Sequence, residues 1–122
     1  MRKMILHGEI TERYWNEVKK SANKRGIPFL VEPKSTWEMF LKQNKRCALS
    51  GVMLDFVTFG YRGTASLDRI DSCVPYTPEN VQWTTGPLNL MKGRNDQRYF
   101  IAECTKVALH HNSQLAEALL SI

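Results

Sequence analysis

The stretch between residues 64 and 93 contains strand, loop, strand and helix signals in that order, and this order limits the possible folds. Residues 64–71 (TASLDRID) combine apolar and charged residues as a half-buried strand does. Two prolines and an asparagine mark 72–80 (SCVPYTPEN) as a loop, and 80–85 (NVQWTT) is typical of a second short strand. Thr85 or Gly86 can cap a helix with Pro87 in its first position, ending near Gly93. The sequence thus predicts a β-hairpin followed directly by a short helix.

The remaining chain is mostly helical in pattern, which predicts an α+β fold with helices around the small hairpin. Apolar residues at helical spacing predict a helix over 10–24, a second from Pro33 or Ser35 to Arg46, and a third over 96–111. Residues 27–31 and 47–56 are expected to be extended, and 113–120 to add a final helical turn or two. Two groups of side chains are expected in the core: the tryptophans Trp15, Trp37 and Trp83, and a stripe on the third helix of Phe100, Ile101, Cys104, Val107 and Ala108.

Length and composition indicate one soluble domain spanning 1–122. We divide it into a helical N-terminal part (about 10–46), the hairpin and helix (47–95) and C-terminal helices (96–122). No run approaches a membrane span and no signal peptide is recognisable, so we expect a cytoplasmic protein. Three widely spaced cysteines suit neither a disulfide framework nor a CxxC zinc site, and reduced thiols are expected.

The formal net charge of +5 favours a polyanionic partner, nucleic acid above all. The basic residues gather in three groups, although solvated helix faces and helix ends explain about half of them equally well. The groups are Lys19, Lys20, Lys24 and Arg25; Lys42, Lys45 and Arg46; and Lys92, Arg94 and Arg98.

A hairpin packed on the following helix would bring Asp68 close to Asn89. A carboxylate and an amide oxygen suit a hard cation such as Mg²⁺, which keeps several waters and takes only one or two protein carboxylates. Pairs of this kind are also common in proteins that bind no metal, and a salt bridge of Asp68 with Arg69 or Arg62 is the structural alternative.

The combination SLDRID, PENVQWTT and LNLMK, in this order, resembles the HNH endonuclease superfamily, whose catalytic unit is the ββα-metal hairpin and helix. The similarity is greater to a branch of small, mostly phage-encoded HNH-like proteins, through SANKRGIPF, KRCALSGVML, TASLDRIDS, PYTPENVQW and LNLMKG. It covers about residues 10–95, and the ordered set is more specific than any single piece. For a phage protein, the cytoplasm would be that of the host cell.

The resemblance implies roles for individual residues. Asp68 corresponds to the metal-binding aspartate, Asn89 to the ligand on the helix, and Asn80 to the asparagine that fixes the loop between the strands. Lys92, one turn after Asn89, is expected to contact a substrate phosphate, and Arg62, Arg69 and Arg94 are further candidates for nucleic-acid contact. Mg²⁺ or Mn²⁺ would be the cofactor. Because only Cys47 remains of the cysteine pairs found in zinc-containing relatives, no structural zinc is expected.

Arg69 occupies the position of the histidine that activates water in the superfamily. An arginine stays protonated and cannot be that base, although it can bind a phosphate or form an ion pair with Asp71. The base is therefore open among Asp71, His7, Tyr61, Tyr76 and a second metal-bound water, with Asp71 our first choice. We give His110 and His111 a helix-end role.

Three functions follow as hypotheses. The first is a one-metal endonuclease that hydrolyses phosphodiester bonds of DNA, expected to be double-stranded, with a homodimer left open. The second is an HNH scaffold that lost catalysis with its histidine and now only binds nucleic acid or metal. The third is a phage factor that acts through a protein partner.

Overall fold

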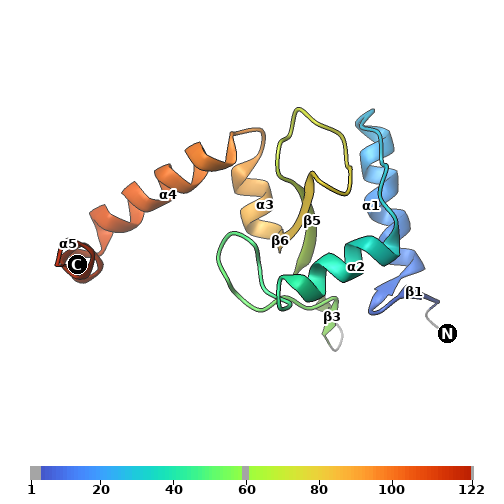
Figure 1. Ribbon diagram of the computed structural model, residues 1–122, viewed down its shortest axis with the longest axis horizontal. Helices are drawn as coiled ribbons and strands as arrows, with labels where there is room; N and C mark the ends of the chain where they lie inside the picture. The colour runs from blue at the N-terminus through green and yellow to red at the C-terminus, as the bar shows by residue number, and fades with distance from the viewer. Residues whose placement is uncertain (1–3, 59–60, 122) are drawn as a thin grey trace.

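The computed structural model describes residues 4–58 and 61–121, without the side chains of 57–58, 61–62, 115–116 and 119. It shows an α+β protein, which confirms the expected fold class (Figure 1). Within the described residues the helices are α1 (Glu12–Lys24), α2 (Pro33–Lys42), α3 (Gly86–Lys92), α4 (Gln97–His111) and α5 (Ser113–Leu120). The strands are β1 (Ile5–His7), β2 (Ile10–Thr11), β3 (Val57–Thr58), β4 (Tyr61–Arg62), β5 (Ala65–Arg69) and β6 (Val81–Thr85).

The strands form three antiparallel pairs, and β5 with β6 is the longest of them. Its register runs from Ala65 opposite Thr85 to Arg69 opposite Val81, so Asp68 lies opposite Gln82. Thr85 caps α3 by accepting a hydrogen bond from the Leu88 amide (3.4 Å), and α3 ends at Gly93, whose φ of 54° favours glycine. The predicted order of strand, loop, strand and short helix is confirmed, whereas the β1–β2 and β3–β4 pairs were not predicted.

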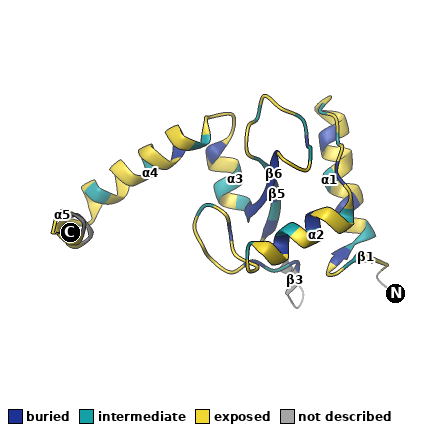
Figure 2. Ribbon diagram, viewed as in Figure 1, coloured by how far each residue is buried: buried dark blue, intermediate teal, exposed yellow. Residues whose placement is uncertain are grey.

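The core lies between β6 and the two N-terminal helices, and it is largely aromatic. Trp83 is fully buried, its ring centroid is 4.9 Å from that of Phe56, and its indole N–H donates to the Thr36 carbonyl (2.8 Å). Gln43, just after α2, accepts a hydrogen bond from the Trp83 amide (2.9 Å). Trp15 is also buried and Trp37 packs against the cluster, so the core assignment of the three tryptophans is confirmed. Figure 2 shows β5 and β6 as mostly buried strands.

The loop between β5 and β6 packs against the segment after α1. Phe29 and Tyr76 form an isolated parallel bridge, in which the Leu30 amide donates to the Tyr76 carbonyl (2.8 Å). The Tyr76 ring lies 5.3 Å from Phe29, and its hydroxyl accepts from Arg25 (2.8 Å). The extended segment predicted at 27–31 is therefore the support of this loop, with Val31 buried and Leu30 exposed.

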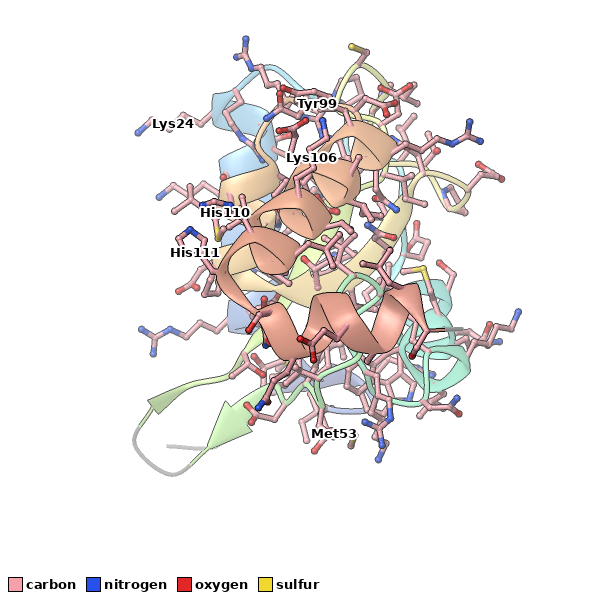
Figure 3. All side chains as sticks on the ribbon, turned by 90° about the vertical axis from the view of Figure 1, so that its left-hand side faces the viewer. Lys24, Met53, Tyr99, Lys106, His110 and His111 are labelled. Carbon is pink, nitrogen blue, oxygen red and sulfur yellow. The ribbon has the colours of Figure 1, made fainter. Side chains whose placement is uncertain are left out.

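Helix α4 projects away from the hairpin, and α5 packs at its far end (Figure 1). The core stripe predicted for α4 is confirmed only at Phe100, which is buried. Of its other members, Cys104 is half-buried, and Ile101, Val107 and Ala108 are exposed. In Figure 3 the helix crosses the face toward the viewer, and Lys106, His110 and His111 are labelled on it. A helical pattern identifies the apolar side of a helix but not whether another element covers it.

No helix of the described residues is long and apolar enough to cross a membrane.

Candidate functional site

The two faces of β5 serve different purposes, because successive side chains of a strand point to opposite sides. Ser66 and Asp68 face α3: Asn89 donates from Nδ2 to Ser66 Oγ (2.9 Å), and Lys92 forms an ion pair with Asp68. Leu67 lies in the core on the other face, and Arg69 follows it there toward the loop. Asp68 and Arg69 are neighbours in sequence but belong to opposite faces.

Asp68 is a buried carboxylate that accepts hydrogen bonds from two side chains. Its side chain is 4% exposed, and its Oδ2 accepts from Lys92 Nζ and from Gln82 Nε2 (2.9 Å). The Gln82 contact is a direct cross-strand pair, since the two residues lie opposite each other in the hairpin. A buried carboxylate needs such partners because it is taken out of water. The salt-bridge partner that the structure gives Asp68 is thus Lys92. Of the two partners named by the structural alternative, Arg69 directs its guanidinium to loop carbonyls, and the side chain of Arg62 lies outside the described residues.

Lys92 is the buried end of α3, and its ammonium has three acceptors. Besides Asp68 Oδ2 it donates to the Arg69 carbonyl (2.8 Å) and to Gln97 Oε1 (3.4 Å), and the side chain is 1% exposed. Gln97, the first residue of α4, also accepts from Gln82 Nε2 (2.8 Å). This group of Asp68, Gln82, Lys92 and Gln97, which we call the Asp68 network, joins β5, β6, α3 and α4.

Asn89 lies against β5 next to Asp68. It is half-buried, and its two hydrogen bonds use Nδ2, toward Ser66 Oγ and toward the Leu67 carbonyl (3.4 Å). The two candidate metal ligands therefore come from adjacent elements, as the hairpin-plus-helix arrangement predicted. Both bonds of Asp68 involve Oδ2 and both bonds of Asn89 involve its nitrogen, so Asp68 Oδ1 and Asn89 Oδ1 lie outside these contacts.

Asn80 fixes the loop between the strands through four hydrogen bonds. Its Oδ1 accepts from the Asp71 amide (2.9 Å), and its Nδ2 donates to the carbonyls of Asp71 (2.9 Å), Val74 (3.0 Å) and Pro75 (3.0 Å). The side chain is buried, as a structural asparagine should be. The geometry matches the loop-fixing role expected for Asn80.

Arg69, at the start of the same loop, also stabilises its backbone. One guanidinium nitrogen, Nη1, donates to the carbonyls of Ser72 (2.7 Å) and Val74 (3.2 Å), and the guanidinium carbon lies 5.4 Å from the centroid of the Tyr76 ring. A planar cation over an aromatic face is a favourable arrangement. The position of the superfamily's histidine suggested a phosphate contact for Arg69, with an ion pair to Asp71 as the alternative, whereas these contacts give Arg69 a role in loop structure.

The candidates for the general base are scattered. Asp71 is exposed in the loop, and its Oδ1 accepts from the Cys73 amide (2.8 Å). Tyr76 is buried with its hydroxyl on Arg25, and His7 lies in β1. The side chains of Tyr61 and Arg62 lie outside the described residues. Arg94 is exposed, and its carbonyl accepts from Ser72 Oγ (3.2 Å), which ties the loop to the chain after α3.

Sequence reasoning missed Gln82 and Gln97. Gln82 could have been found from the alternation of the strand, because it directly precedes Trp83, which was expected in the core, and so faces the other side of the sheet. Gln97 gives no such signal, since its contact depends on how α4 starts relative to α3. Among the described residues, no group of three or more His, Cys, Asp and Glu side chains is placed to hold a metal ion.

Comparisons with known protein families, with curated proteins and with solved structures gave no match.

Proposed function

We propose that this chain is an HNH-type metal-dependent endonuclease that hydrolyses phosphodiester bonds of DNA. The observation that supports this most is the position of Asp68 and Asn89, one on β5 and the other on the helix that covers the same face of β5. Together with the ordered motifs of the sequence, this is the arrangement a ββα-metal unit requires.

The residues fit a divalent cation in their chemistry. Mg²⁺ prefers oxygen ligands and keeps several waters, so one carboxylate and one amide are a sufficient protein contribution. Asp68 would hold the ion through its carboxylate and Asn89 through its amide oxygen, in each case an oxygen outside the hydrogen bonds described above. When bound, the cation would act as a Lewis acid on the scissile phosphate and the leaving oxygen.

The general base remains a proposal with Asp71 as its first candidate. Arg69 stays protonated and has its Nη1 on loop carbonyls, so we assign it a positioning role on the loop that carries Asp71. Asp71 is exposed and can receive a proton from water. Its position depends on Asn80, which holds the Asp71 backbone on both sides.

Double-stranded DNA is the proposed substrate because the chain is basic and its cations are accessible. Arg94 is exposed just after α3 and Arg98 is exposed in the first turn of α4, and further exposed cations lie at the ends of α1 and α2. Such side chains suit contacts with backbone phosphates, which add affinity without sequence preference. Whether two copies cooperate in cutting both strands stays a prediction.

A second candidate function is nucleic-acid binding without cleavage. It is favoured by one observation, namely that an ammonium already neutralises the only carboxylate of the proposed metal site. A scaffold of this kind would bind DNA in a salt-dependent way and would need no divalent ion.

Plasmid cleavage and gel-shift binding, measured on the same protein samples, separate the two functions. The endonuclease proposal expects nicking or cutting of supercoiled DNA that requires Mg²⁺ or Mn²⁺ and disappears in Asp68→Asn. The binding-only function expects intact plasmid at every metal concentration and equal DNA affinity for the parent and Asp68→Asn.

A further inference from the structure

Lys92 satisfies all of its hydrogen-bonding capacity inside the protein. An ammonium has three N–H donors, and the three acceptors here are Asp68 Oδ2, the Arg69 carbonyl and Gln97 Oε1. The side chain is 1% exposed, so solvent contributes almost nothing to its charge stabilisation. Lys92 therefore depends on Asp68, and Asp68 depends on Lys92.

A divalent cation at Asp68 would meet this ammonium. Lys92 contacts the carboxylate directly, so an ion bound to the same carboxylate would lie within a few ångström of a positive charge. Repulsion between a unit charge and a divalent ion at such a distance amounts to several kcal/mol even at an effective dielectric constant of about 20. The Lys92 ammonium and the divalent ion therefore cannot both bind Asp68 tightly.

From this contact we infer that Lys92 competes with the divalent cation for Asp68 and is transferred to a phosphate of the nucleic acid when the cation binds. The inference rests on the proposed function and concerns the regulation of the same site. It combines the ion pair that the structure gives Lys92 with the phosphate contact that the resemblance implied. The ion pair holds the ammonium while no substrate is bound, and a phosphate oxygen replaces Asp68 as its acceptor afterwards.

The consequence is that metal and nucleic acid bind cooperatively. A phosphate that takes up the ammonium leaves Asp68 open to the cation, and by linkage the cation favours phosphate binding to the same extent. In the free protein Lys92 keeps the affinity for divalent ions low. This would restrict metal-dependent chemistry to the complex with DNA.

The test is the affinity of the free protein for Mn²⁺, measured by titration calorimetry and by the loss of the free Mn²⁺ resonance signal. Lys92→Met keeps the length and the apolar stem of the side chain but removes its charge. We expect Lys92→Met to bind Mn²⁺ about tenfold more tightly than the parent, or better. Lys106→Met, which removes an exposed lysine of α4, is the matched control and should bind Mn²⁺ as the parent does.

One outcome would overturn the competition and leave the proposed function intact. In it, Lys92→Met binds Mn²⁺ no more tightly than the parent, and Asp68→Asn binds Mn²⁺ more weakly than the parent. If the parent, Lys92→Met and Lys92→Gln all fail to bind Mn²⁺, both the inference and the metal-dependent function are wrong. Circular dichroism shows which variants are folded. If Lys92→Met does not fold, Lys92→Gln takes its place, because a neutral amide can still donate to Asp68 and should give the same gain in affinity.

Discussion

Asn80 uses its whole side-chain amide to hold the loop that carries Asp71. We expect Asn80→Ala to lower the free energy of unfolding by about 3 kcal/mol, because it removes a buried amide that makes four hydrogen bonds to the backbone of the loop. Urea unfolding measures this change. Glu79→Ala, at the exposed neighbouring position, is the control and should stay within about 0.5 kcal/mol of the parent.

A substitution of Arg69 tests whether the position next to Asp68 has a catalytic or a structural role. We expect Arg69→His to destabilise the protein by about 1–2 kcal/mol, because imidazole cannot reach both loop carbonyls as the guanidinium does. It should not increase plasmid cleavage, since side chain 69 lies on the face of β5 opposite to Asp68. A gain of cleavage in Arg69→His, with unchanged stability, would contradict this assignment.

The residues differ in how far sequence could predict them. Asn80 was predictable, because an asparagine directly before a short strand has few roles other than fixing the turn. The ion-pair partner of Asp68 was not predictable, because the sequence does not show that α3 packs on the face of β5 that carries Asp68. Arg69 was interpreted from its position in a motif, whereas the alternation of the strand determines where its side chain points.

At the scale of elements, the attachment of α4 depends on its first turn. Asp96 caps α4 by accepting from the Tyr99 amide (3.1 Å), and the next residue, Gln97, enters the Asp68 network. We expect Asp96→Ala to cost about 1 kcal/mol in urea unfolding, because the cap is lost. Asp96→Asn is the control, since asparagine caps a helix equally well, and a loss as large as that of Asp96→Ala would exclude the capping explanation.

Local sequence signals predicted the hairpin and α3 well because each of their ends is marked. Pro87 and Gly93 delimit α3, and the prolines and Asn80 delimit the loop. The pairs β1–β2 and β3–β4 are two or three residues per strand and have too little pattern to be recognised. The prediction that the α4 stripe lies in the core was wrong, because Phe100 is the one member of this stripe that is buried.

For the whole molecule, charge is distributed unevenly along the chain. Residues 97–122 contain Arg98 and Lys106 against Glu103 and Glu117, which is a net charge of zero, so the preceding 96 residues hold the entire excess of +5. If phosphates bind to this excess, the projecting helices contribute little to DNA affinity.

We therefore expect a chain ending at Glu103 to fold and to bind DNA with the same salt dependence as the full chain. This shortened chain keeps Gln97 and Phe100, and it omits the part of α4 whose described side chains are exposed or half-buried. Gel-shift titrations at several salt concentrations measure the slope. A slope that falls by one unit or more on truncation would place phosphate contacts on the removed segment and contradict the expectation.

The most direct test of the account is cleavage of supercoiled plasmid as a function of Mg²⁺ and Mn²⁺ concentration, with Asp68→Asn and Asn89→Ala beside the parent. We predict metal-dependent nicking or cutting by the parent, and its loss in both variants while circular dichroism shows them folded. Glu117→Gln removes the same charge as Asp68→Asn but on α5, away from the site, and should cut normally. Plasmid that stays intact with the parent, or equal cleavage by folded Asp68→Asn, would contradict the proposal that Asp68 and Asn89 form the metal site of an endonuclease.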